Sequence, residues 1–322
     1  MQNSSLSQRN RKSARHLSQR IAYCRQVMQI TLCLGGTILA GIQIAKFISS
    51  TTDERKYLSW SIGLVVGALL VAIALSPLLE GFITRLALKI RNRGFAIAIY
   101  SSPLLLTLLL LIVKICLGQD SLVWENLSSE RGVSEYGTAI FYLLVSVFAY
   151  PMVRPFWREG RKLMAVCYGL LTLAGFFVGM EEISWGQRLI GFEEPQFWAE
   201  HNAQSEFTFH NLSFYHEHLL NESFIVVGLI GSFSWLALRW WQPRKLMRQI
   251  DLSYIVPDWF ISSFFYPTLI FYIIHVFTDG LGFFITRDQE HCEFIMSLGI
   301  LLFVVINFLR QANDRDRLNL SD

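Results

Sequence analysis

Long apolar runs alternate with short polar connections along most of the 322-residue chain. A helix needs about 20 mostly apolar residues to cross the hydrocarbon core of a bilayer. Eight runs fit that requirement, and they lie at 27–48, 57–79, 95–117, 136–153, 163–183, 223–241, 255–277 and 293–309. The fourth is the least regular, because Pro151 and Pro155 interrupt its end. The pattern predicts an all-α fold, a polytopic transmembrane helical bundle of about eight spans with both termini in the cytoplasm.

The composition supports a membrane protein over a soluble domain. Hydrophobic residues make up 52% of the chain and charged residues only 16%. The first apolar run is too long for the hydrophobic region of a signal peptide, so we interpret it as a retained span. The predicted divisions are a basic cytoplasmic arm at 1–26, a transmembrane bundle at 27–309 and a cytoplasmic tail at 310–322.

The placement of Lys and Arg gives the orientation. The second, fourth and sixth connections and the tail hold clusters, which are Arg85, Lys89, Arg91, Arg93; Arg154, Arg158, Arg161, Lys162; Arg239, Arg244, Lys245, Arg248; and Arg310, Arg315, Arg317. The other connections carry one or two each. The positive-inside rule therefore places the even connections in the cytoplasm. The positive charges of the N-terminal arm are explained in the same way, as residues that keep this end of the chain in the cytoplasm. The expected partner is therefore the lipid bilayer, and no nucleic acid is expected.

The polar chemistry collects at the end of the fifth apolar run, where the connection that we call the long loop (184–222) begins. Ionisable groups at the edge of a hydrocarbon layer are costly to place and are functional candidates by default. The candidate catalytic residues are Glu181, Glu182, Ser184, Gln187 and Arg188. By the predicted topology they lie on the outer, extracytoplasmic side.

Helical phase separates the two adjacent carboxylates. If the fifth helix continues through the motif, Glu181, Ser184 and Arg188 share one face. Glu182 then falls on the face of Gly175, where another helix can approach closely. Glu182 is therefore the carboxylate expected to point into the bundle. The structural alternative is that one carboxylate pairs with Arg188 or caps a neighbouring element.

The long loop and the seventh run supply further candidates. The residues expected to bind a substrate or partner are Trp185, Asn202, Gln204, Glu206 and Asn211. The hypothetical metal ligands are His210, His216, His275 and Asp279. Histidines and carboxylates around an open position suit zinc, which activates water for hydrolysis. The alternative for His275 and Asp279, one turn apart, is a hydrogen bond at a helix end.

The string from Glu181 to Arg188, followed by the downstream residues Asn202, Gln204, Glu206, His210 and Asn211, resembles a signature of uncharacterised bacterial multi-span membrane proteins. That resemblance implies a bacterial inner-membrane protein and brings no established activity. In residue types the chain is also faintly similar to the alkaline ceramidase-like membrane hydrolases, which use Ser, Asp and several His around zinc. It departs from them in having eight predicted spans instead of seven and no HxxxH, since His275 is followed by Asp279.

Three functions remain open. The first is a membrane-embedded hydrolase or transferase acting on a lipid or lipid-linked substrate, with Glu182 as base or ligand and Arg188 binding an anionic headgroup. The second is a non-catalytic assembly or sensing factor that binds another membrane protein through the long loop. The third is a transporter, disfavoured because the polar residues collect at one end of the spans.

Overall fold

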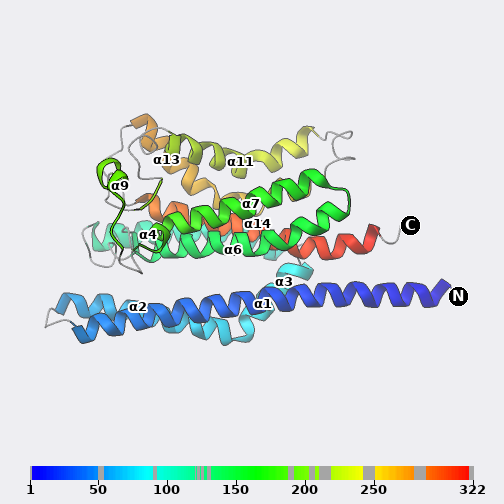
Figure 1. The fold of residues 1–322 in the computed structure, drawn as a ribbon, viewed down its shortest axis with the longest axis horizontal. Coiled ribbons are helices and arrows are strands. Elements are labelled where there is room, and N and C mark those ends of the chain that lie inside the picture. Colours follow the sequence, from blue (N-terminus) through cyan, green and yellow to red (C-terminus); the bar gives the residue numbers. More distant parts are fainter. Residues whose placement is uncertain are drawn as a thin grey trace. The chain divides into compact units, whose positions relative to one another are not determined.

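The computed structural model describes most of the chain, namely residues 2–49, 54–89, 93–119, 121, 124, 127–128, 132–187, 192–202, 207–209, 219–241, 251–278 and 288–318. The regular elements that it describes are helices, which confirms the all-α prediction (Figure 1). The chain divides into two compact units. Unit 1 comprises Met1–Phe95 and Val305–Asp322, and unit 2 comprises Ala96–Val304.

Unit 1 is built on a helical hairpin. Helix α1 (Gln2–Ser49) packs along α2 (Glu54–Leu75), and the pair is closest where Gly67 meets Gly36. A Cβ atom on Gly67 would lie 2.6 Å from the Gly36 carbonyl oxygen, so the small residues permit this contact. The predicted run 57–79 is divided at Ser76, where α2 and α3 (Pro77–Lys89) are bent by 61°. Proline has no N–H for the helix ladder, which explains the break.

Unit 2 is a helical bundle. Its elements are α4 (Arg93–Leu117), α6 (Val133–Arg158), α7 (Lys162–Glu182), η1 (Ser184–Gly186), α9 (Gln196–His201), α11 (Leu219–Trp241), η2 (Leu252–Tyr254), η3 (Ser262–Phe264), α13 (Tyr266–Thr278) and α14 (Gln289–Leu318). Helices α4 and α14 extend into unit 1. Helix α14 contacts several of the others, because Phe294 packs on Phe141 of α6 and the Thr268 hydroxyl of α13 donates to the Cys292 carbonyl at 2.8 Å.

Helices α6 and α7 form an antiparallel hairpin (Figure 1). A Cβ atom on Gly175 would lie 2.8 Å from the Tyr142 carbonyl oxygen, which confirms the close approach expected at this glycine. The expected interruption at Pro151 and Pro155 is wrong, because α6 continues through both to Arg158. Phe148, which is fully buried, is among the packed side chains that hold this part of the helix in place.

The seventh predicted span differs most from its expected form. The 3-10 turn η2 ends just before the apolar run 255–277, the run itself contains the 3-10 turn η3, and regular helix starts only at Tyr266. Pro257 and Pro267 explain the late start, because proline suits a first helical turn but not a helix interior. At 13 residues, α13 is shorter than the roughly 20 residues that a perpendicular span needs.

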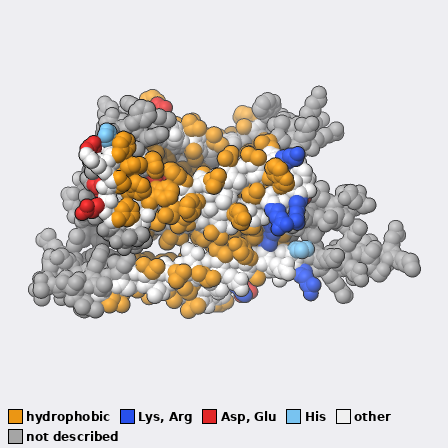
Figure 2. All heavy atoms as spheres, in the orientation of Figure 1, with side chains coloured by type: hydrophobic (Ala, Val, Ile, Leu, Met, Phe, Trp, Pro, Cys, Tyr) orange, Lys and Arg blue, Asp and Glu red, His pale blue; other side chains and the backbone are white. Residues whose placement is uncertain are grey.

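Five of the described helices are long and apolar enough to cross a membrane, and a sixth crossing is possible if the bent α2–α3 pair is one span. These helices fit a multi-pass membrane protein that associates with lipid; the count of eight stays a prediction. Leu170 and Leu173 of α7 are 62% and 67% exposed, as expected of lipid-facing side chains. In Figure 2, hydrophobic side chains cover the middle of the visible face of unit 2.

The two ends of the α6–α7 hairpin differ in charge. The basic end is the turn between the helices, and it carries Arg154, Arg158, Arg161 and Lys162. The acidic end is where α6 begins and α7 ends, and it carries Glu135, Glu181 and Glu182. Figure 2 shows Lys and Arg at the basic end and Asp and Glu around α9, which follows α7 at the acidic end. This distribution is that expected for a helix pair oriented by the positive-inside rule.

Candidate functional site

Helix α7 stops at Glu182, so the condition under which Glu181 and Ser184 would share one helical face is not met. Ser184, Trp185 and Gly186 follow with φ angles of 49°, 51° and 81°. Left-handed backbone is uncommon for residues other than glycine, and each such residue costs about 1–3 kcal/mol. The surrounding contacts hold this turn, since the Gly186 N–H donates to the Ile183 carbonyl at 2.9 Å and Ser184 is fully buried.

The Glu181 carboxylate holds the long loop against the end of α7. Glu181 is only 4% exposed. One carboxylate oxygen accepts a hydrogen bond from the Trp185 indole N–H, and the other accepts one from the Phe209 backbone N–H at 2.6 Å. Because both oxygens are satisfied by the chain's own donors, Glu181 has a clear structural task at this position.

Gln187 acts on the same segment of the loop. Its side-chain oxygen accepts a hydrogen bond from the Phe207 N–H at 2.6 Å, and its amide nitrogen donates to Glu194 at 3.1 Å. Phe207 and Phe209 are two residues apart, so Glu181 and Gln187 bind the N–H groups of alternate residues in this short segment.

Asn202 closes the loop from its other side. Its amide nitrogen donates to the carbonyl and hydroxyl oxygens of Thr208 at 3.0 and 3.2 Å, and the Trp198 indole donates to the same carbonyl at 3.2 Å. Trp198 also packs on Phe207, with ring centroids 4.8 Å apart. The motif thus folds the described parts of the long loop into a compact structure over the end of α7, seen beside α9 in Figure 1.

Several predicted site residues lie outside the described residues. They are Arg188, Gln204, Glu206, His210, Asn211, His216 and Asp279. His275 lies on α13 and stacks on Phe271, with ring centroids 5.9 Å apart. Within the described residues, no group of three or more His, Cys, Asp or Glu could hold a metal ion, so His275 is not joined to Glu181 and Glu182 in such a group.

Glu182 points into a second, different environment. It is half-buried and interacts electrostatically with four other carboxylates. We call this set the carboxylate cluster; its members are Glu135 of α6, Glu181 and Glu182 of α7, and Glu290 and Glu293 of α14. The Tyr272 hydroxyl of α13 donates to Glu293 at 2.5 Å. Like charges repel, so such a cluster is more stable when some of its members are protonated.

A buried ion pair lies between α4 and the start of α14. The Lys114 ammonium and the Asp288 carboxylate are 2.5 Å apart, with side chains 2% and 4% exposed. Lys114 also lies over the Trp124 ring at 5.6 Å, and that ring contacts His291 at 5.7 Å. His291 is 5% exposed, and its Nδ1 atom has no hydrogen-bond partner among the described residues. The chain thus places a second set of ionisable groups inside unit 2.

No family model, curated protein or solved structure matches the chain. Its apolar helices are compatible with an integral membrane protein, and the geometry of its polar groups supports the more specific proposals below.

Sequence reasoning missed the convergence of Glu135, Glu290 and Glu293 around Glu182. Glu290 and Glu293 are one helical turn apart, but Glu135 and Glu182 are far from them in the chain, and no periodicity links the three helices. One signal was available, because each glutamate lies in the first two turns of a helix that borders an apolar run. Lys114 gave a clearer signal, since a lysine within an apolar helix requires a carboxylate partner.

Proposed function

We propose that the protein is a membrane-embedded hydrolase or transferase that acts at the outer leaflet on a lipid or lipid-linked substrate. The observation that carries the proposal is the carboxylate cluster. Carboxylates from three helices interact electrostatically at the acidic end of unit 2, where the long loop folds over the end of α7. Ionisable groups brought together within membrane helices are costly and mark functional sites more often than structural ones.

Neighbouring carboxyl groups supply acid–base chemistry. When two carboxyl groups share one proton, the ionised member can accept a proton from an attacking nucleophile, while its protonated neighbour donates to the leaving group. Glu182 is the candidate base because Glu181 already binds two donors of the chain. Glu293, held by the Tyr272 hydroxyl, is the candidate acid. A zinc ion bound by His210 and His216 would add activation of water, and this remains part of the hypothesis.

The loop motif contributes shape to this site. The Gln187 amide binds Phe207 and Glu194 and so positions the loop. In the proposal, Arg188 is therefore the residue that binds the anionic headgroup. A planar guanidinium can donate two parallel hydrogen bonds to the oxygens of one phosphate group. Trp185 packs on Phe177 of α7, with ring centroids 5.6 Å apart, which supports a role in keeping the turn closed.

The proposal is tested in proteoliposomes made from bacterial lipid extract, with lipid products identified by mass spectrometry. Wild-type protein is expected to convert a lipid species, and Glu182→Gln is expected to lower the rate by about 100-fold or more, within the range for loss of a general base. Glu193→Gln, on an exposed residue of the long loop, is the control and should match wild type. Wild-type turnover by folded Glu182→Gln would contradict the assignment.

A second candidate function is favoured by the exposed surface of the long loop. Its polar motif residues hold the loop's shape, while Phe192, Phe197 and Phe209 are 37%, 53% and 39% exposed. Exposed aromatic side chains on a rigid loop suit a protein partner or the lipid interface. A photo-crosslinker at Phe197 distinguishes the two: a single crosslinked protein supports an assembly factor, and crosslinks to lipid alone support the enzyme.

A further inference from the structure

Helix α3 of unit 1 has two sides of different character. One side is buried where α3 packs against α1, and it consists of Leu79, Ile83 and Leu86. The other side carries Leu78, Phe82 and Arg85, which are four and then three residues apart and therefore share a helical face. Leu78 and Phe82 are 73% and 36% exposed, and Arg85 is also exposed. We call this side the exposed face of α3; along it, two apolar side chains are followed by a cation.

Two contacts within unit 1 fix the depth of α3 along α1. Arg25 of α1 lies 3.0 Å from the Glu80 carboxylate, and the Gln29 side chain donates to the Ala74 carbonyl at 3.1 Å. Arg25 and Gln29 flank the position where the first apolar run, 27–48, begins. Helix α3 therefore starts at the edge of that run, at the end that we expect in the cytoplasm from the positive-inside rule.

The direction of α3 differs from that of a membrane span. The bend at Ser76 turns α3 by 61° from α2. Its 13 residues extend for about 20 Å, which is too short to cross the hydrocarbon core of a bilayer. If α2 runs near the membrane normal, α3 lies closer to the membrane plane than to the normal. A helix in that orientation, with an apolar and a basic part, is typical of the membrane interface.

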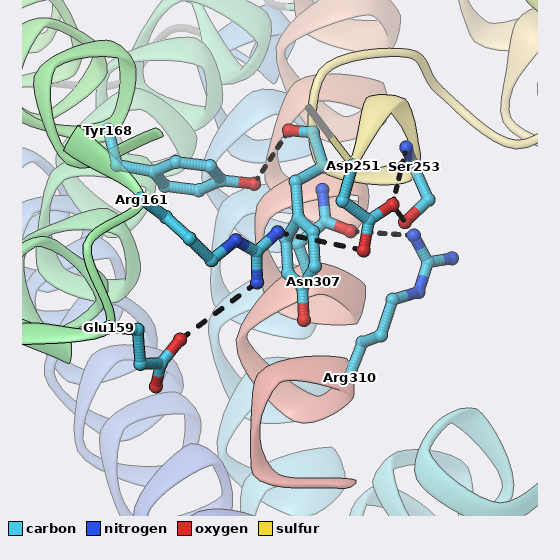
Figure 3. A network of polar contacts seen from close by, with 8 residues as sticks. Glu159, Arg161, Tyr168, Asp251, Ser253, Asn307 and Arg310 are labelled. Carbon is cyan, nitrogen blue, oxygen red and sulfur yellow. Dashed lines mark hydrogen bonds and ion pairs between the residues drawn. The ribbon is translucent and has the colours of Figure 1, made fainter. Parts of the chain in front are cut away.

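The charge of Arg85 is not balanced by a neighbouring carboxylate. In unit 2, by contrast, Arg161 lies 3.9 Å from Glu159 and 3.6 Å from Asp251, which together form the Arg161 network (Figure 3). Across the described ranges of the chain, Arg85 makes no hydrogen bond or ion pair. The sequence contains no Asp or Glu between Glu80 and Asp120. The Arg85 guanidinium is thus available to an anion from outside the chain.

Phe82 connects the exposed face to the start of α4. Its ring packs on that of Phe95, with centroids 6.1 Å apart. Arg93, which is exposed, lies two residues before Phe95 in the same part of unit 1. The aromatic pair therefore brings a second basic segment to the exposed face of α3.

We propose that the exposed face of α3 binds an acidic phospholipid of the inner leaflet. Leu78 and Phe82 contact an acyl chain, and Arg85 donates hydrogen bonds to the phosphate, a pairing that suits the guanidinium geometry. A phospholipid presents its apolar and anionic groups in the same order as this face presents their partners. A lipid with net negative charge is favoured over a zwitterionic one, whose ammonium group offsets the attraction to Arg85.

Native mass spectrometry of the delipidated, detergent-purified full chain tests this site. Wild-type protein is incubated separately with phosphatidylglycerol and phosphatidylethanolamine that carry the same acyl chains. We expect phosphatidylglycerol to bind at least about fivefold more tightly, the contribution typical of one Lys or Arg near anionic headgroups. Equal binding of the two lipids overturns the proposal. Inorganic phosphate at the lipid concentration should leave phosphatidylglycerol bound, and displacement would overturn the assignment to a lipid.

Three variants locate the bound lipid. Arg85→Gln should lower phosphatidylglycerol binding by about fivefold, whereas Arg85→Lys keeps the charge and should retain most of it. Leu78→Asp leaves every cation in place and should also weaken binding, because it puts a carboxylate on the apolar part of the face. Unchanged binding in these folded variants would show that the lipid does not occupy the exposed face. If Arg85→Gln does not fold, Leu78→Asp decides.

Arg15→Gln is the matched control, because it removes the same charge from another exposed position of unit 1. Arg15 precedes Arg25 by ten residues of α1, which places it about 15 Å further from the apolar run. That separation exceeds the Debye length of about 8 Å at physiological salt. The control should bind phosphatidylglycerol as wild type does, and equal losses in Arg15→Gln and Arg85→Gln would contradict a specific site on α3.

Discussion

At the scale of single residues, the polar motif after α7 has two tasks. Glu181, Gln187 and Asn202 use their side chains to bind backbone groups of the long loop. Glu182, adjacent in sequence, instead joins carboxylates of α6 and α14. The end of α7 at Glu182 allows this division, because the left-handed turn at Ser184 changes the direction of the chain. Adjacent carboxylates can therefore serve different purposes.

Glu181→Ala should release the long loop. The change leaves the Trp185 indole and the Phe209 N–H without their acceptor, and each unsatisfied buried donor costs about 1–3 kcal/mol. Hydrogen exchange at the Phe209 amide should become faster by at least about tenfold, consistent with a loss of roughly 1.4 kcal/mol or more. Glu193→Ala, on an exposed loop residue, is the control. Unchanged exchange at Phe209 would show that other contacts hold the loop.

The Lys114–Asp288 pair should behave as a buried ion pair. Lys114→Met leaves an uncompensated carboxylate in the bundle and should cost about 3–5 kcal/mol of stability. The double variant Lys114→Met/Asp288→Leu removes both charges and should recover most of that loss. Thermal unfolding midpoints in detergent measure both. Equal stability of the single variant and wild type would contradict the geometry of this pair.

At the scale of helices, much of the arrangement follows from the sequence. The apolar runs correspond to helices α4, α6, α7 and α11 within about five residues, and the last run lies inside the longer α14, because a run of 20 apolar residues in lipid has few alternatives to helix. The form of the seventh run was not predictable, since the 3-10 turns before Tyr266 depend on prolines and on tertiary packing. The left-handed turn at Ser184 gave no sequence signal other than Gly186.

The candidate site was predictable only in part. The sequence predicts that Glu182 is the bundle-facing carboxylate, but it could not give the neighbours of Glu182. The electrostatic interactions of Glu182 with Glu135 and Glu293 link helices that are distant in sequence, and they depend on how those helices pack. The pairing of Lys114 with Asp288, 174 positions apart, has the same origin.

Gly175→Ala should weaken the α6–α7 hairpin. The added Cβ would lie 2.8 Å from the Tyr142 carbonyl oxygen, a backbone atom that cannot move without shifting α6. Overpacking of this kind costs about 1–3 kcal/mol. Gly169→Ala is a matched control on the same helix, because no atom lies within 4 Å of its Cβ position. The control should be neutral or slightly stabilising, and equal losses in both variants would contradict the packing.

At the scale of the whole molecule, the two ends of unit 2 differ in the groups that they carry. The acidic end carries the carboxylate cluster and the folded part of the long loop, and the basic end carries the Arg161 network. From the positive-inside rule we expect the acidic end outside and the basic end in the cytoplasm. The proposed outer-leaflet acid–base site depends on that orientation.

The most direct test is therefore the labelling of single cysteines in intact cells, in a cysteine-free background, with a membrane-impermeant maleimide. Glu193→Cys reports the long loop, and Arg158→Cys reports the turn between α6 and α7. We predict that Glu193→Cys is labelled in intact cells, while Arg158→Cys is labelled only after the membrane is permeabilised. Labelling of Arg158→Cys from outside, with protection of Glu193→Cys, would contradict the orientation and the outer-leaflet function with it.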